Sequence, residues 1–137
     1  MNIGFIGLGI MGTPMALHLV EAGHQLFVKT RSKVPDAIAS TNAKACASGE
    51  EVARQSDVIF LMVPDTPDVE TVLFGAQGVA AGLSKGKVVV DMSSISPIAT
   101  KEFARKINEA GADYVDAPVS GGEVGAKAAS LTIMCGA

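Results

Sequence analysis

Residues 2–12 of the chain read Asn-Ile-Gly-Phe-Ile-Gly-Leu-Gly-Ile-Met-Gly, an apolar run that passes into a glycine-rich loop. The run over residues 2–6 predicts a buried strand, and a helix is expected to begin at residue 12. In a Gly-x-Gly-x-x-Gly loop between a strand and a helix, the first glycine allows a tight turn and the second leaves room for a pyrophosphate. The third lets the helix pack closely on the strand. The sequence therefore predicts a dinucleotide site formed by Gly7, Leu8, Gly9, Ile10, Met11 and Gly12.

The rest of the chain alternates short β-branched runs with longer segments of helical period. This alternation is typical of a Rossmann-type, doubly wound α/β fold, in which helices cover both faces of a mainly parallel sheet. One NAD(P)-binding domain over residues 1–137 accounts for the pattern. Strands are predicted over residues 2–6, 25–30, 44–46, 58–63, 87–91, 113–116 and 131–134. Helices are predicted over 12–22, from about 34, over 50–56, from 66, and over 97–110.

Several helix ends are marked by residues with specific backbone preferences. Gly23 is predicted to close the first helix in the left-handed conformation, and Gly111 to stop the last one. Thr66 and Ser96 each precede a proline, so we expect each hydroxyl to cap a helix whose first residue is that proline.

The composition favours an enzyme or binding protein for small molecules. The 137 residues are 48% hydrophobic and include 11 Lys and Arg against 14 Asp and Glu, with no basic run that could bind nucleic acid or an anionic membrane. The longest apolar stretch, 58–63, is too short to span a bilayer. The N-terminus has no signal-peptide pattern, which predicts a cytoplasmic protein. Cys46 and Cys135 match no metal-binding spacing and are predicted to be small buried hydrophobic residues.

The end of the second predicted strand bears on the choice between NAD and NADP. An NAD-selective site places an acidic residue about 20 positions past the glycine loop, where it binds the ribose 2′-hydroxyl. This chain has Thr30, Arg31 and Ser32 there instead. A guanidinium and a hydroxyl near a helix start suit a 2′-phosphate. The sequence therefore favours NADP(H), with NAD(H) as the alternative if Arg31 is only a solvated surface residue.

Three further segments carry a resemblance to a known family. They are 63–67 (Val-Pro-Asp-Thr-Pro), 91–97 (Asp-Met-Ser-Ser-Ile-Ser-Pro) and 116–122 (Asp-Ala-Pro-Val-Ser-Gly-Gly). With the glycine loop, they make the whole chain resemble the β-hydroxyacid dehydrogenase family, which includes 3-hydroxyisobutyrate dehydrogenases. The positions that the resemblance implies for cofactor binding are Val63, Pro64, Asp65 and Ser94. Those that it implies for substrate binding are Ser120, Gly121 and Gly122.

The residues themselves support these roles. The two cofactor segments follow predicted parallel strands, and ligands of open α/β sheets bind outside the carboxyl ends of the strands. Two consecutive glycines beside a serine can direct N–H groups and a hydroxyl at a carboxylate. An ordinary turn at the strand end is the alternative for Pro64 and Asp65, and a turn hydroxyl near the following helix is the alternative for Ser94. Taken without the resemblance, Ser120-Gly121-Gly122 is equally compatible with an ordinary loop. Asp116 can equally well fix its own loop, so it is assigned no chemistry.

The resemblance also implies parts of the protein that lie beyond residue 137. Family members use a lysine as general acid, carried by a helical C-terminal domain that completes the cleft and builds a homo-oligomer. No catalytic residue is therefore assigned in this chain, and the chain alone is expected to bind cofactor with little or no turnover. His18, His24 and Lys127 do not match the position of the lysine and are expected to be structural or solvated.

The reaction implied by the resemblance is a hydride transfer from the nicotinamide. It reduces 2-hydroxy-3-oxopropanoate (tartronate semialdehyde), a small aldehydo-acid of glyoxylate metabolism, to glycerate. Alternative substrates are 3-hydroxyisobutyrate, a related β-hydroxyacid or an imine. A different class of function, an NADP-binding module without catalysis, also stays open.

Overall fold

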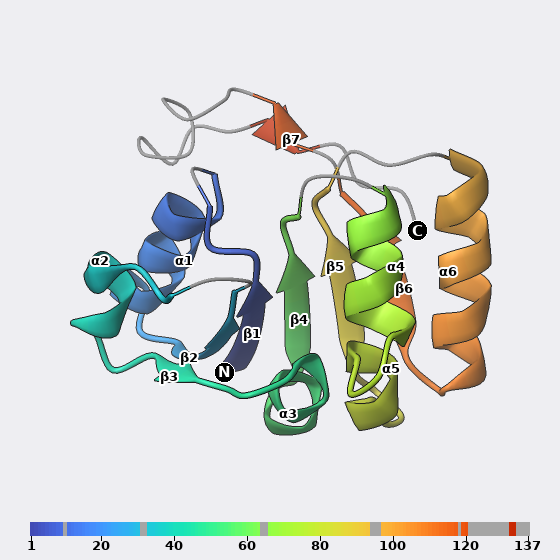
Figure 1. Ribbon diagram of the computed structural model, residues 1–137, viewed down its shortest axis with the longest axis horizontal. Helices are drawn as coiled ribbons and strands as arrows, with labels where there is room; N and C mark the ends of the chain where they lie inside the picture. The colour runs from blue at the N-terminus through green and yellow to red at the C-terminus, as the bar shows by residue number, and fades with distance from the viewer. Residues whose placement is uncertain are drawn as a thin grey trace.

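The computed structural model describes residues 1–9, 11–30, 33–63, 66–93, 97–117, 119–120 and 132–133. Its centre is a six-stranded sheet in which every neighbouring pair of strands is parallel. The strands are β1 (Asn2–Ile6), β2 (Gln25–Lys29), β3 (Lys44–Ala45), β4 (Val58–Leu61), β5 (Val88–Asp91) and β6 (Asp113–Asp116). Their order in the sheet is β3-β2-β1-β4-β5-β6 (Figure 1). This is the strand order of a Rossmann fold, which confirms the predicted fold class.

Helices cover both faces of this sheet (Figure 1). One face carries α1 (Gly12–Glu21) and α2 (Asp36–Ala39). The other carries α3 (Gly49–Gln55), α4 (Thr66–Phe74), α5 (Val79–Gly82) and α6 (Pro97–Glu109). A separate antiparallel pair joins β7 (Val119–Ser120) to β8 (Thr132–Ile133). Within the described part of the chain, no helix has the length and apolar character needed to cross a membrane.

The hydrophobic core has two layers, because alternate residues of each strand point to opposite faces of the sheet. Phe5 packs with Ala16 of α1 in one layer. Leu61 packs with Leu73 of α4 and Ile107 of α6 in the other. All five side chains are fully buried. Burial of each of the larger ones stabilises the fold by about 1.5–3 kcal/mol, so both helical layers are held firmly to the sheet.

The end of α1 confirms the predicted left-handed glycine. Gly23 has a φ of 94°, and its N–H donates to the Val20 carbonyl oxygen at 3.0 Å. The N–H of His24 donates to the Leu19 carbonyl oxygen at 3.3 Å, which completes a Schellman cap. Gly111 ends α6 in the same conformation, with a φ of 87°.

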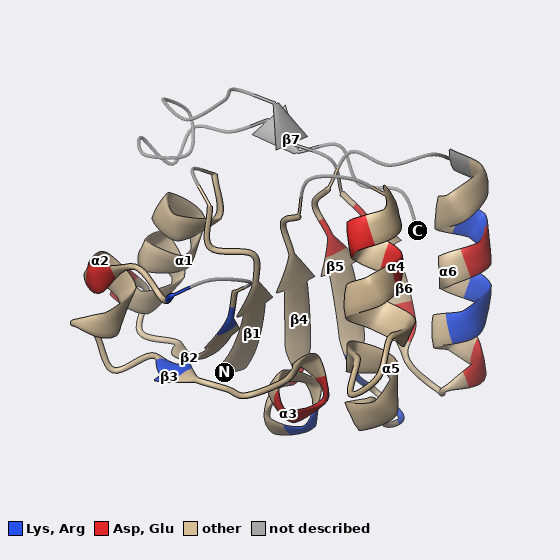
Figure 2. Ribbon diagram, viewed as in Figure 1, with Lys and Arg blue, Asp and Glu red and all other residues tan. Residues whose placement is uncertain are grey.

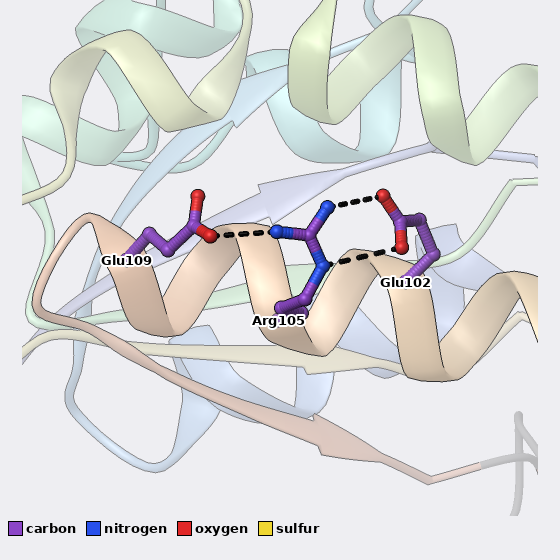
Figure 3. A network of polar contacts seen from close by, with 3 residues as sticks. All are labelled: Glu102, Arg105 and Glu109. Atoms are coloured by element: carbon purple, nitrogen blue, oxygen red, sulfur yellow. Dashed lines mark hydrogen bonds and ion pairs between the residues drawn. The ribbon is translucent and has the colours of Figure 1, made fainter.

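The outer surface of α6 is strongly charged (Figure 2). Arg105 lies between Glu102 and Glu109 and forms an ion pair of 2.6 Å with each of them (Figure 3). These side chains are exposed, so the pairs contribute little to stability. The opposite side of the helix buries Phe103 and Ile107 in the core.

Strand β3 forms one edge of the sheet. It has only two residues, Lys44 and Ala45, and both are exposed. Cys46 follows them, with its N–H donating to the Val28 carbonyl oxygen at 2.8 Å. Cys46 was predicted to be buried, but its side chain is only half-buried against the core. This partial burial raises the pKa of its thiol. Cys135 lies outside the described residues.

Most predicted elements are found with small shifts at their ends. β4 ends at Leu61, two residues before the predicted end. α4 begins at Thr66 itself, so this residue opens the helix instead of preceding it. Ser96, the other predicted cap, lies outside the described residues. The sequence patterns did not predict α5 or β7, which have four and two residues and are too short to show a period.

Candidate functional site

A pocket of about 680 Å³ opens where the carboxyl ends of β1, β2, β4 and β5 meet. β1 and β4 are neighbours in the sheet, and the strand order reverses between them. Ligands of open α/β sheets bind in the crevice at this reversal point. The volume lies in the range of small-molecule sites. The lining residues are Ile6, Gly7, Leu8, Gly9, Met11, Gly12, Lys29, Thr30, Met62, Val63, Asp68, Thr71, Val72 and Ser93.

The three glycines of the loop after β1 have different surroundings. Gly7 has a φ of 102°, and a Cβ there would collide with the carbonyl oxygen of Met62. A Cβ on Gly12 would collide with the carbonyl oxygen of Gly7. A Cβ on Gly9, in contrast, would meet no atom within 4 Å. The fold therefore requires glycine at positions 7 and 12, whereas at position 9 only a bound ligand would require it.

The start of α1 lies directly after the loop and has no side-chain cap. Within its first turn, the N–H of Thr13 donates to the Gly9 carbonyl oxygen at 3.0 Å. Met11, the N-cap residue, makes no capping hydrogen bond with its side chain, and the first turn contains no acidic residue. The hydroxyl of Thr13 donates to the Leu8 carbonyl oxygen at 2.9 Å and holds the loop against the helix. A helix start without a side-chain cap or an acidic residue leaves the positive end of the helix dipole uncompensated, and this end attracts an anion such as a pyrophosphate.

The end of β2 supplies a cation and a hydroxyl to the pocket. Lys29 and Thr30 both line it, and the Lys29 ammonium donates to the Thr30 carbonyl oxygen at 3.2 Å. Thr30 directly follows the last residue of β2, in the region where an NAD-selective site has an acidic residue. Arg31 and Ser32 lie outside the described residues.

A buried group of polar atoms joins the ends of β4 and β5 to Tyr114 of β6. The hydroxyl of Tyr114 donates to Oδ2 of Asp91 at 2.5 Å, and the N–H of Ser93 donates to Oδ1 of the same carboxylate at 2.9 Å. Oγ of Ser93 accepts the N–H of Val63 at 3.0 Å. We call Asp91, Ser93, Tyr114 and the Val63 N–H the Asp91 cluster.

Burial governs the protonation of the acids in this region. It raises the pKa of Asp91, against the effect of the hydrogen bonds from Tyr114 and Ser93. It also raises the pKa of Tyr114, and the hydrogen bond to Asp91 acts in the same direction. The pKa of Asp116 is raised by burial and by the nearby Asp91 carboxylate. Asp91 and Asp116 lie opposite each other in the β5–β6 register, so the charge of one disfavours the charge of the other.

The pocket brings together many of the predicted cofactor residues. Those that line it are Gly7, Leu8, Gly9, Met11, Gly12, Thr30 and Val63. Predicted site residues outside the described part of the chain are Ile10, Arg31, Ser32, Pro64, Asp65, Ser94, Gly121 and Gly122. Ser120 is placed in β7. Neither His18 nor His24 lines the pocket, and no group of residues in the described ranges could hold a metal ion.

The sequence patterns missed seven lining residues, which are Ile6, Lys29, Met62, Asp68, Thr71, Val72 and Ser93. Three of them, Asp68, Thr71 and Val72, come from α4, which contributes part of the pocket wall. The predicted start of that helix gave its position in the chain but not which face would turn to the pocket. Lys29 had a readable signal, because period-2 alternation places it on the same side of β2 as the buried Phe27.

The six parallel strands in this order, with a glycine loop at the reversal point, define an NAD-binding domain of the oxidoreductase type. The sequence model described as the NAD binding domain of 6-phosphogluconate dehydrogenase matches residues 2–137. The chain belongs to this family of NAD-binding domains. The use of NAD or NADP follows from the family.

Individual relatives confirm the resemblance to β-hydroxyacid dehydrogenases. The chain is 59% identical over 136 residues to 2-hydroxy-3-oxopropionate reductase of Escherichia coli (strain K12), covering 99% of this chain and 47% of that protein. It is 47% identical to 2-(hydroxymethyl)glutarate dehydrogenase of Eubacterium barkeri, covering 99% and 46%. The chain thus spans about half the length of the curated relatives it matches.

Solved structures of the same family have the same fold. A 3-hydroxyisobutyrate dehydrogenase of Mycobacterium tuberculosis superposes with a TM-score of 0.88 at 33% identity, covering 98% of this chain and 46% of that one. Psf3, solved in complex with NADP⁺ and 2-OPP, superposes with a TM-score of 0.89 at 32% identity, covering 97% and 48%. These relatives are dehydrogenases and reductases of small molecules or carry a nicotinamide cofactor, in agreement with the fold and the pocket.

Proposed function

We propose that this chain is the cofactor-binding part of a reductase that uses NADP(H) to reduce 2-hydroxy-3-oxopropanoate to glycerate. The observation that carries the proposal is the open position of Gly9 beside the uncapped start of α1. It supports a pyrophosphate site at the point where the strand order reverses. The choice of reaction rests on the 59% identity to the reductase of Escherichia coli.

The pocket residues fit a dinucleotide along its whole length. The space above Gly9, which a Cβ would fill, and the start of α1, which has no side-chain cap, suit the pyrophosphate. Lys29 and Thr30 suit the ribose at one end, and Val63 and Ser93 lie on the wall that would face the nicotinamide. The nicotinamide supplies the hydride when bound. The residues of this chain bind it, orient it and exclude water from it.

We propose that the substrate is bound by Ser120, Gly121 and Gly122, which would contact its carboxylate or hydroxyl. We propose that a lysine in the remaining part of the protein supplies the proton that the reduction consumes. We also propose that this part forms a helical domain and that the whole protein is a homo-oligomer. Residues 1–137 alone are then expected to bind cofactor with little or no turnover. A cytoplasmic location stays a prediction.

A substrate panel tests the proposed reaction. The protein that carries this chain would be assayed for oxidation of NADPH and NADH with 2-hydroxy-3-oxopropanoate. The reverse reaction would be assayed with 3-hydroxyisobutyrate and 2-(hydroxymethyl)glutarate. The expected result is a kcat/KM for 2-hydroxy-3-oxopropanoate that is at least about ten-fold higher than for 3-hydroxyisobutyrate or 2-(hydroxymethyl)glutarate. Preference for another acid would replace the proposed substrate, and dinucleotide binding without any turnover would indicate a non-catalytic module.

The preference for NADP(H) has a separate test. Arg31→Ala is expected to lower the ratio of NADPH affinity to NADH affinity by roughly 10- to 100-fold, because a charge-assisted contact to the 2′-phosphate is lost. The ratio would be measured by calorimetry with both reduced cofactors. Arg54→Ala is a matched control, since Arg54 is exposed on α3, pairs with Glu50 at 3.0 Å and does not line the pocket. An unchanged ratio in Arg31→Ala would show that position 31 does not select the cofactor.

A further inference from the structure

The Asp91 cluster contains the only charged side chain that is buried among the described residues. Both oxygens of the Asp91 carboxylate accept a hydrogen bond, one from Tyr114 and one from the Ser93 N–H. A buried carboxylate costs far more free energy than an apolar side chain of similar size, unless donors of this kind compensate it. An apolar residue would be the simpler choice if this position served only to pack the core.

The hydrogen bonds of the cluster lead from the core to the pocket. Tyr114 and Asp91 do not line the pocket, whereas Ser93 and Val63 do. The carboxylate of Asp91 fixes the backbone of Ser93 through its N–H, and Oγ of Ser93 then fixes the N–H of Val63. The cluster therefore sets the geometry of two pocket-lining segments that come from different strands.

We propose that Asp91 is a positioning residue, which acts through Ser93 to hold the ends of β4 and β5 in the geometry that binds the nicotinamide half of the cofactor. This inference rests on the proposed function, since the segments that it orients continue into positions 64, 65 and 94. Tyr114 assists from β6 by holding the carboxylate in place. None of the three side chains needs to touch the reacting atoms.

The positioning role predicts a loss that is confined to one half of the cofactor. Ser93→Ala removes the acceptor of the Val63 N–H and adds no volume. It is expected to lower the affinity for the full dinucleotide by about 10-fold. The affinity for the adenosine half is expected to stay within about 2-fold, because that half would contact the glycine loop and the end of β2. The adenosine-half ligand is 2′,5′-ADP or 5′-ADP, whichever the unmutated protein binds more tightly.

Two further variants test whether Asp91 acts through Ser93. Tyr114→Phe and Asp91→Asn each weaken the hold on Ser93, and each is expected to reproduce the selective loss. Because Asp91 reaches the Val63 N–H only through Ser93, the loss in Asp91→Asn combined with Ser93→Ala should be smaller than the sum of the two single losses. Tyr114→Phe keeps the test possible if Asp91→Asn fails to fold. Ser40→Ala is the control, since its hydroxyl contacts only the end of α2 and lies outside the pocket.

Calorimetry with both ligands, below the melting temperature of each variant, gives distinguishable results. A loss of affinity for the dinucleotide but not for the adenosine-half ligand, accompanied by a lower kcat for hydride transfer, supports the positioning role. Equal losses for both ligands, or no loss for either, would overturn it. A wild-type protein that binds neither ligand would instead contradict the proposed function.

Discussion

Gly9→Val is expected to lower the affinity for NADP(H) by about 100-fold or more while the protein stays folded. A Cβ at Gly9 meets no atom within 4 Å, and its backbone is not in the left-handed region, so the fold tolerates a side chain there. The branched side chain would occupy the space in which the pyrophosphate meets the start of α1. Calorimetry would measure the affinity, and thermal unfolding would show a change in Tm of less than about 2 °C.

The control for this variant creates the same valine side chain elsewhere, from an alanine. Ala110→Val lies at the exposed end of α6, outside the pocket, and should leave both the affinity and the fold unchanged. Gly9→Val with normal cofactor affinity would show that the pyrophosphate does not bind at this loop. A strong fall in Tm would show that Gly9 serves the fold instead.

Gly7→Ala, unlike Gly9→Val, is expected to destabilise the fold itself. The expected change is a fall of about 3–5 kcal/mol in the free energy of unfolding. The φ of 102° is strained for any residue with a Cβ, and the new Cβ would collide with the Met62 carbonyl oxygen. That oxygen belongs to the backbone just after β4, so it cannot move without disturbing the sheet. Urea unfolding, with the midpoint and slope compared to the unmutated protein, measures the change.

Gly9→Ala is the matched control for Gly7→Ala, because it adds the same methyl group two residues away in one loop. It is expected to change the free energy of unfolding by less than about 0.5 kcal/mol. A tolerated Gly7→Ala would mean that the loop can relax around the new Cβ, contrary to the contacts of Gly7 with Met62.

The sheet and the glycine loop could be predicted because their signals are local. Residues 3–6 are apolar and the glycine loop follows them, and the structure has β1 over residues 2–6. Gly7 and Gly12 were predicted to shape the turn and the packing of the helix, and the clashes that a Cβ would cause bear this out. Gly9 was predicted to leave room for a pyrophosphate, and a Cβ there meets no atom within 4 Å, although the bound pyrophosphate itself stays a prediction.

The Asp91 cluster could not be predicted, because its contacts join distant segments. Tyr114 follows Asp91 by 23 residues and Ser93 follows Val63 by 30. Their pairing depends on β4, β5 and β6 being neighbours in register, and local propensity does not specify this. Ser94 was selected from the segment 91–97 and lies outside the described residues. Ser93, which was not selected, lies in the pocket wall.

The shortness of β3 affects how the protein behaves in concentrated solution. A long, flat edge strand offers unpaired N–H and C=O groups to which another chain can add a strand, and growth of this kind leads to fibrils. β3 offers only two residues, and the exposed ammonium of Lys44 would repel the same residue of a second molecule. This edge therefore resists intermolecular strand addition without a covering helix.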